Sequence, residues 1–387
     1  PGSSVAIPLA TGDADWSAVG TVTDVVGEKV LMFGHSFLAE GDVDLPMGTA
    51  YVHTVVPGLA GSFKLGSALR TTGAAVRDEY VGMSGRLGRE ASMVPMTVTV
   101  HWVREGLTER YRYGVARHPG LTGMLTMYLA MDAILGWREM PEHHTLRYKL
   151  SLEFENLGRI EAENVSSDAG CFALLSDATR PILTLQNNPL GPPPRLLSVE
   201  MEARIEEGSI EAEVLDLVLD GQVYRPGETV TGQVIVRPFR KDRTAIPVRF
   251  ALPEDLPEGR HVLTASDADG ALSRLRMERP HRFTPRTVEE LREAIGRVLS
   301  VRADHLHLHL PLGRGGVALA ARELPDLPDS KALILAQARP MDASPFAEAL
   351  VRTVPTDYVL YGSAGAAFEV RREAGEIRIH QQNKDAR

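Results

Sequence analysis

The stretch around which this chain is organised is LMFGHSFLAEGDVDLP, residues 31–46. It opens within an apolar run, Val30 to Phe33, which predicts the end of a buried strand. Gly34 then lets the backbone turn tightly, so we expect His35 at the exposed rim of a β-sheet. Because an imidazole exchanges its proton near neutral pH, His35 is the candidate general base, although a single histidine after a strand is also a common structural residue.

Acidic residues follow His35 closely, at Glu40, Asp42 and Asp44. Two interpretations of Asp42 and Asp44 remain open at this point. Either carboxylate could orient the imidazole of His35, as the acidic member of a catalytic triad does. Alternatively, the cluster is a solvated loop with no role in chemistry.

Composition restricts the class of protein. A chain of 387 residues predicts two or three domains, and its 35 Gly and 25 Pro favour many short strands over long helices. The formal net charge of -9, with no block of Lys or Arg, argues against nucleic acid as the main partner. The single cysteine, Cys171, excludes an internal disulfide framework and a multi-cysteine zinc site. No cofactor is expected, and no apolar run is long enough to predict a transmembrane segment.

The pattern of the first half predicts strands with one clear helix. Residues 3–32 alternate apolar and polar side chains between glycine turns, which predicts a three-stranded meander. Residues 93–117 predict a hairpin that turns at Glu105-Gly106. The run LTGMLTMYLAMDAIL, residues 121–135, predicts a helix with a broad apolar, methionine-rich face that packs in the core.

A second half begins after the stiff, proline-rich linker NNPLGPPPR, residues 187–195. Strand-like runs about ten residues apart predict an immunoglobulin-like sandwich over 196–275. The capping box that begins at Thr287 predicts a helix to about residue 300. Strand-like runs then predict a small α+β unit over 280–387; these runs are 305–310, 332–338, 358–361 and 376–380.

Several ordered blocks in the first third resemble the SpoIVB peptidase family of bacterial serine peptidases, in particular its large, envelope-associated variants. The blocks are PGSSVAIPLATGD, GTVTDVVGEKVLMFGHSF, LPMGTAYVHTV, SFKLGS and GMSGRLG. The resemblance implies a chymotrypsin-like or β-barrel-like peptidase domain over residues 1–190, with His35 as its catalytic base. It also implies a polypeptide substrate, and a periplasmic, cell-envelope or extracellular location.

The nucleophile is where the chain departs from the family pattern. The family serine lies in a GMSGSP-type motif, whose small residues let backbone N–H groups approach a developing oxyanion. Here GMSG places Ser84 at that position, but Arg86-Leu87 replaces the expected Ser-Pro. The surrounding AAVRDEYVGMSGRLG also resembles a structural block of the family. In the large variants the serine motif precedes the first block quoted above, so the resemblance implies an incomplete catalytic unit, whose partner is the N-terminal segment of its own precursor and whose processing ends at Pro1.

Other candidates depend on spacing alone. Ser36 adjoins His35, and Ser62 with Lys64 has the spacing of a Ser/Lys pair or of a strand with a surface lysine. HLHLHL, residues 305–310, places three imidazoles on one strand face, which is either a transition-metal site or a half-buried polar face. Asp267-Ala268-Asp269-Gly270 resembles the start of a calcium loop but lacks downstream ligands, so a turn is expected.

These patterns together predict a mainly β protein with a β-barrel-like peptidase domain, a sandwich and a C-terminal α+β unit. The expected function is that of a SpoIVB-like, serine endopeptidase-related protein, a hydrolase acting on polypeptide with His35 as base. The alternative is a non-catalytic envelope protein for binding or structure, built on a degenerate peptidase fold. A convincing nucleophile is missing from the sequence, so the enzyme class stays open.

Overall fold

The computed structural model describes residues 1–387 apart from 60, 137, 326, 339–341 and 373–387. Strands predominate, which confirms the expectation of a mainly β protein. The chain divides into two units. Unit 1 contains Pro1–Ser209 and Pro285–Ser300, and unit 2 contains Ile210–Thr284 and Val301–Arg387.

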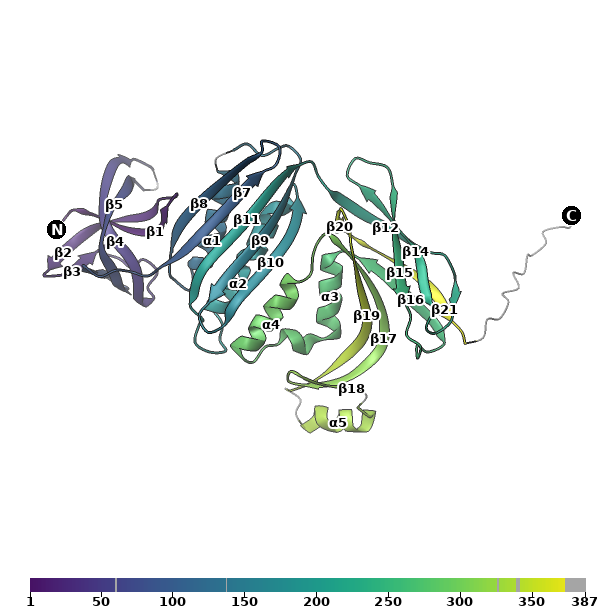
Figure 1. The fold of residues 1–387 in the computed structure, drawn as a ribbon. Coiled ribbons are helices and arrows are strands. Elements are labelled where there is room, and N and C mark those ends of the chain that lie inside the picture. Colours follow the sequence, from purple (N-terminus) through teal and green to yellow (C-terminus); the bar gives the residue numbers. More distant parts are fainter. Residues whose placement is uncertain (60, 137, 326, 339–341, 373–387) are drawn as a thin grey trace, which may run out of the picture. The chain divides into compact units, whose positions relative to one another are not determined.

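The first six strands of unit 1 close into a barrel (Figure 1). They pair in the order β1, β2, β3, β6, β5, β4, and β4 returns to pair with β1. The meander expected over residues 3–32 is confirmed, because β1, β2 and β3 pair consecutively and antiparallel. The six strands are β1 (Ser4–Gly12), β2 (Trp16–Val26), β3 (Lys29–Met32), β4 (Gly41–Val56), β5 (Phe63–Glu79) and β6 (Gly82–Leu87).

The rest of unit 1 is a five-stranded sheet that continues from β1 in the order β8, β7, β11, β9, β10. Helices α1 (Thr122–Leu135) and α2 (Gly170–Gln186) cover one face of this sheet, and α4 (Val288–Leu299) packs on α2 and β10 (Figure 1). The expected hairpin and the expected core helix α1 are both confirmed. The strands are β7 (Met93–Trp102), β8 (Leu107–Ala116), β9 (His144–Phe154), β10 (Gly158–Ser167) and β11 (Leu196–Glu207).

Strand β11 differs from its expected place as the first strand of the sandwich. It lies between β7, with which it pairs in parallel, and β9, with which it pairs antiparallel. Its alternating residues Val199, Met201 and Ala203 are buried in the same core as α1 and α2. The segment 187–195 therefore connects α2 to β11 inside unit 1, and the chain leaves this unit only after Ser209.

A glycine is required at position 12, the last residue of β1, where this strand pairs with β8. Its φ is +96°, and a Cβ built there would lie 2.3 Å from the carbonyl oxygen of Arg112. We therefore expect Gly12→Ala to lower the free energy of unfolding of unit 1 by at least about 2 kcal/mol, because strain and overlap add. Gly27→Ala is the matched control, since Gly27 has φ +60° with open space around it, and should cost about 1 kcal/mol. Equal urea midpoints for the two variants would contradict this account.

Unit 2 contains two sheets that share one apolar core. One sheet has the order β15, β14, β12, β20; the other has the order β13, β21, β16, β17, β18, with β19 also paired to β17. Strands expected in the separate α+β unit thus pair with strands expected in the sandwich, as β20 does with β12 and β17 with β16. The strands are β12 (Glu211–Leu219), β13 (Val223–Tyr224), β14 (Thr229–Pro238), β15 (Thr244–Ala251), β16 (Gly259–Ser266), β17 (His305–Leu319), β18 (Arg322–Pro325), β19 (Ala343–Pro355), β20 (Val359–Tyr361) and β21 (Ser363–Val370).

The sequence pattern predicted none of the three helices described in unit 2. Asp267, expected in a turn, is the N-cap of α3 (Ala268–Glu278), where its carboxylate accepts a hydrogen bond from the Gly270 N–H. A short 3-10 helix, η1 (Pro280–Phe283), follows. The strand expected at 332–338 is wrong, because these residues belong to α5 (Asp329–Ala338), and the strand expected at 376–380 lies outside the described residues.

The capping box at Thr287 predicted α4 correctly. The Thr287 side chain accepts a hydrogen bond from the Glu290 N–H at the start of this helix, although the Glu290 carboxylate accepts from the Arg286 N–H rather than from Thr287. None of the helices in the described part of the chain has the length and apolar composition needed to cross a bilayer.

Candidate functional site

The His35 loop is the chain between β3 and β4, residues 33–40. Phe33 and Gly34 both adopt positive φ, at 70° and 72°, and Ala39 has φ 58°. Left-handed backbone at two non-glycine residues is costly, so it persists only where surrounding contacts impose it. The His35 side chain is exposed in this loop, at the rim of the barrel, as the Gly34-His35 pair predicted.

Asp78, near the end of β5, holds the loop in this conformation. Its carboxylate accepts three backbone hydrogen bonds: from the N–H of Phe37 at 2.7 Å, of Leu38 at 2.5 Å and of Ala39 at 2.7 Å. The Asp78 residue is only 1% exposed. A buried carboxylate is tolerated when several N–H groups point at it, so Asp78 and the loop stabilise each other.

The ring of His35 has a defined orientation. Its Nδ1 lies 2.6 Å from the carbonyl oxygen of Ser36, and its ring meets Phe33 edge to face with 5.8 Å between centroids. A carbonyl oxygen can only accept a hydrogen bond, so Nδ1 carries the proton of the neutral ring. Nε2 then has the free lone pair, which is the atom that a general base uses.

The two aspartates that were candidates for orienting His35 bind arginines instead. Asp42 is 85% exposed and lies 3.3 Å from Arg77, on β5. Asp44 lies 3.2 Å from Arg89 and also accepts a hydrogen bond from the Ser92 N–H. The interpretation in which either carboxylate orients the imidazole is therefore wrong; the Ser36 carbonyl does so.

Glu40, at the end of the loop, contacts a second histidine. Its Oε2 lies 2.9 Å from Nε2 of His118, which is 3% exposed and precedes α1. Nδ1 of His118 accepts a hydrogen bond from the Gly120 N–H, so the proton of the neutral His118 ring is on Nε2, facing Glu40. This contact joins the end of the His35 loop to the start of α1.

The candidate nucleophiles are not brought to His35. Ser84 lies within β6, opposite Leu31 on β3 and Arg77 on β5, and Met83 beside it points into the core. The hydrogen bonds among the described residues include none between His35 and the hydroxyl of Ser84, Ser36 or Ser62. Lys64 donates to the Thr21 hydroxyl at 2.7 Å, which favours a strand with a surface lysine over a Ser/Lys pair.

The three imidazoles of HLHLHL take separate partners rather than converging. His305 bonds Asp304, His307 lies 3.2 Å from the Arg302 carbonyl oxygen, and His309 lies 2.6 Å from Glu278 on α3. Burial lowers the pKa of His307, and the hydrogen bond to the Arg302 carbonyl opposes this effect. Within the described ranges, no three His, Cys, Asp or Glu side chains form a potential metal site.

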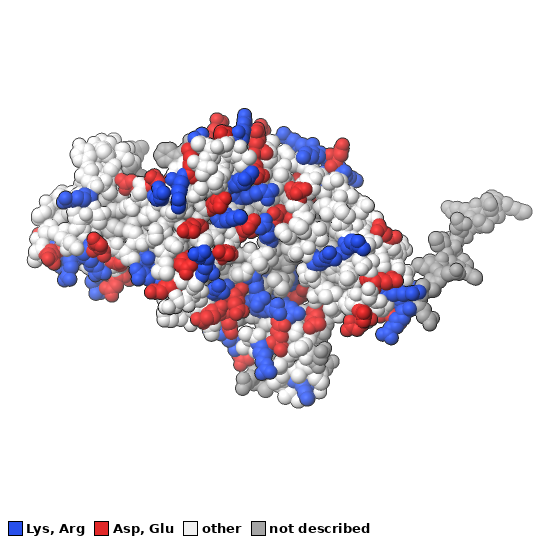
Figure 2. Space-filling view, viewed as in Figure 1, with Lys and Arg blue, Asp and Glu red and all other residues white. Residues whose placement is uncertain are grey.

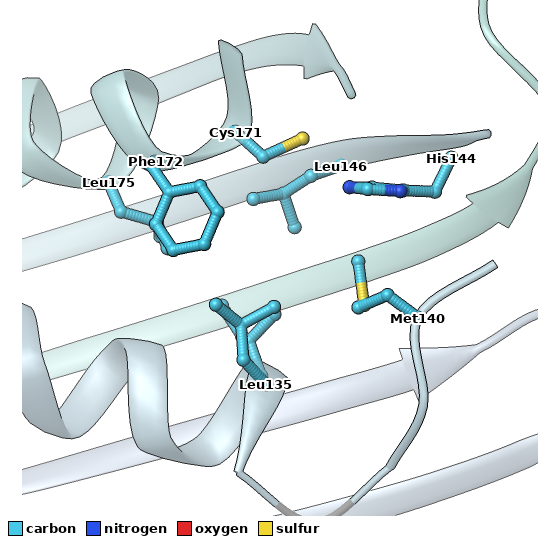
Figure 3. Close-up of a pocket in the computed structure, with 8 residues that line it drawn as sticks. Leu135, Met140, His144, Leu146, Cys171, Phe172 and Leu175 are labelled. Carbon is cyan, nitrogen blue, oxygen red and sulfur yellow. The ribbon is translucent and has the colours of Figure 1, made fainter. Parts of the chain in front are cut away.

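A separate apolar pocket lies between α1, α2 and β9 (Figure 3). Its volume is about 250 Å³, and its walls are Ile134, Leu135, Met140, His144, Leu146, Cys171, Phe172 and Leu175. Nδ1 of His144 donates to the Pro141 carbonyl oxygen at 2.9 Å, and the thiol of Cys171 faces the Ser166 carbonyl oxygen at 3.7 Å. This pocket can accept an apolar group, but the elements that build it do not include the His35 loop.

Sequence reasoning did not assign roles to Asp78 and His118. Asp78 lies in AAVRDEYVGMSGRLG, the stretch that resembles a structural block of the family, and that resemblance was the available signal. His118 is separated from Glu40 by most of the barrel sequence, and no local pattern joins them. Comparisons of the chain with protein-family models, with curated proteins and with solved structures gave no match.

Proposed function

We propose that this chain is a SpoIVB-like, serine peptidase-related protein that acts on polypeptide, with His35 as the general base. The observation that carries the proposal is the state of the His35 ring. Its Nδ1–H donates a hydrogen bond to the Ser36 carbonyl oxygen, and its Nε2 lone pair is available on an exposed loop. In peptide hydrolysis Nε2 would accept the proton of an attacking hydroxyl and return it to the leaving amine.

The residue that supplies the attacking hydroxyl is still to be identified. The part of the chain that the structure describes offers no serine hydrogen-bonded to His35, so on this proposal the nucleophile approaches the open rim from elsewhere. The Asp78 carboxylate would then serve as a positioning group, since it fixes the backbone of the loop that presents the ring. The sequence blocks around Gly34-His35 support an envelope or extracellular location through their resemblance alone.

The test compares hydrolysis of fluorescent casein by the full product of the gene in three forms. His35→Ala should lower the rate by at least about 10³-fold, because a triad loses most of its rate enhancement with its base. His53→Ala is the matched control, since His53 is also exposed on the barrel, bonds the Ser67 hydroxyl at 3.0 Å and meets the Tyr51 ring edge to face. Its rate should stay within about twofold of the wild type. Equal loss in both variants, or none in either, would remove the assignment of His35.

A second function is favoured because, among the residues that the structure describes, a backbone carbonyl and no carboxylate bonds His35. Both nearby aspartates bind arginines, which is consistent with a barrel that has lost its catalytic set and serves for binding or structure. A fluorophosphonate probe separates the two functions, because it labels only an activated serine. Labelling that disappears in His35→Ala supports the peptidase, and labelling that disappears in Ser84→Ala would identify Ser84 as the nucleophile. Unlabelled protein that also leaves casein intact supports the binding function.

A further inference from the structure

The β4–β5 arm is the part of the barrel hairpin in which β4 and β5 pair only with each other. It contains residues 50–56 of β4 and 63–69 of β5. The strands have other partners only outside the arm: β4 pairs with β1 at Gly48 and Thr49, and β5 pairs with β6 from Gly73 onward. Figure 1 shows the two strands continuing beyond the ring of the barrel.

One face of this arm is apolar and open to solvent. Side chains alternate along a strand, so Phe63, Leu65 and Ser67 share a face, and Tyr51 joins them because it pairs with Ser67; Leu69 follows at a register shift between the pairs formed by Thr49 and Ala50. The exposed fractions are 57% for Tyr51, 59% for Phe63, 51% for Leu65 and 65% for Leu69. A single large apolar side chain that is half exposed is ordinary on a protein surface. A contiguous set of such side chains on one face indicates a binding surface.

The charge around this face is unlike that of the whole chain. No Asp or Glu occurs in residues 47–76, and the two charged residues there are Lys64 and Arg70, although the chain has 51 acidic residues and a formal net charge of -9. Lys64 and Arg70 are both exposed; Lys64 alternates with Phe63 and Leu65 and so lies on the opposite face of the ribbon, where it donates to the Thr21 hydroxyl. The surface over the arm in Figure 2 is correspondingly almost free of red. An acid-free, cationic surface complements a negatively charged partner.

The shape of the arm selects the kind of partner. A site for a peptide or a small ligand is usually concave, with walls that bury the guest. The arm is a two-stranded ribbon whose apolar side chains project outward, two of them aromatic, with cationic side chains nearby. Aromatic and aliphatic side chains that project beside Lys or Arg are typical of segments that enter the interfacial region of a bilayer.

We infer that the β4–β5 arm binds anionic lipid surfaces by inserting Tyr51, Phe63, Leu65 and Leu69 into the headgroup region. Lys64 and Arg70 remain at the level of the lipid phosphates, where each is attracted to the negative surface. The insertion is shallow, on the order of 5–10 Å, so the barrel itself stays in water. This inference does not depend on the catalytic role proposed for His35.

Vesicle flotation tests the inference on the whole chain. The protein should float with phosphatidylcholine vesicles that contain about 30% phosphatidylglycerol, and its binding should weaken in high salt and with phosphatidylcholine alone. A Phe63→Ser/Leu65→Ser variant should bind these vesicles about tenfold or more weakly. The matched control is Tyr80→Ser/Val81→Ser, which removes two side chains that are 86% and 81% exposed in the turn between β5 and β6.

A fluorescent label reports insertion separately from binding. Cys171 is the single cysteine of the chain and is buried, so a cysteine introduced by Leu65→Cys can be labelled selectively with bimane. Its emission should shift to the blue when the anionic vesicles are added, because the probe leaves water. The same label introduced by Tyr80→Cys should not shift.

Three results would overturn the inference. The first is failure of the wild-type chain to float with anionic vesicles, and the second is equal flotation of the wild type and Phe63→Ser/Leu65→Ser. The third is a concentration-dependent dimer, lost in that variant and accompanied by no lipid binding, which would assign the arm to a second copy of the chain. Circular dichroism of the variants should match the wild type, since all four substituted side chains project from the surface.

Discussion

Asp78→Ala is expected to lower the free energy of unfolding of unit 1 by about 3–5 kcal/mol, because a buried carboxylate that accepts three N–H groups is lost. The N–H groups of Phe37, Leu38 and Ala39 would be left without acceptors, in a loop where three residues, Ala39 among them, have positive φ. Urea unfolding followed by far-UV circular dichroism measures the change. Asp42→Ala is the control, since its exposed pair with Arg77 should contribute less than about 1 kcal/mol.

Asp78→Asn retains the shape of the side chain at position 78 and changes its hydrogen bonds to the loop. The amide retains one acceptor oxygen but presents an NH₂ group to the N–H groups on the other side. We expect a loss between those of Asp42→Ala and Asp78→Ala, together with faster hydrogen exchange at residues 37–39. If Asp78→Ala unfolds at the wild-type urea concentration, then the His35 loop is held by contacts other than this carboxylate.

Glu323→Ala should have a comparable effect in unit 2, about 3–5 kcal/mol, because it leaves two partly buried arginines and His281 without the carboxylate that they share. The Glu323 carboxylate contacts Arg279 at 2.5 Å, His281 at 2.7 Å and Arg282 at 2.6 Å. Its side chain is 24% exposed, and that of His281 is 4% exposed. Truncation removes the only carboxylate among these contacts, whereas Glu323→Gln retains its shape and removes its charge.

The same carboxylate predicts a particular dependence of stability on pH. Burial raises the pKa of Glu323, but hydrogen bonds from Arg282, Arg279 and His281 outweigh burial and lower the pKa to about 2 from the ordinary 4.5. The folded state therefore holds the proton less tightly than the unfolded chain. This contribution, about 3 kcal/mol, is complete above pH 4.5 and is lost as the pH falls towards 2.

Other carboxylates titrate over the same range, so the measurement is a difference. The free energy of unfolding of the wild type minus that of Glu323→Gln should fall as the pH is lowered from about 5 to about 2. A difference that stays constant over this range would show that Arg279, His281 and Arg282 do not lower the pKa of Glu323.

The sequence predicted local elements better than their partners. Apolar alternation identified β1 to β3 and the β7–β8 hairpin, and the apolar face of residues 121–135 identified α1, because these patterns are local. Helix α2 was missed, since it begins without a side-chain cap and contains Pro181 in its interior. The α5 segment was assigned to a strand because a short apolar run does not distinguish the two structures.

In the candidate site too, the sequence predicted the local features and not the contacts between distant residues. Gly34-His35 at the end of an apolar strand predicted an exposed imidazole, which is a local property. Asp78 could not be found by spacing, because it lies about 40 residues from the backbone groups that it binds. The pairing of β11 with β7 and β9 is likewise non-local, and a register between distant strands is specified by burial in the folded sheet rather than by either strand alone.

The chain passes from unit 1 to unit 2 after Ser209, returns for Pro285–Ser300, and leaves again. During synthesis, therefore, α4 can cover its part of α2 and β10 only after the chain has been translated past Ser300. A segment of unit 2 has been synthesised by then, but its partner strands β17 to β21 have not. A truncated protein ending at Ser209 would expose the apolar surface that Ile295 and its neighbours cover in unit 1. When expressed, this truncated protein should be recovered in inclusion bodies.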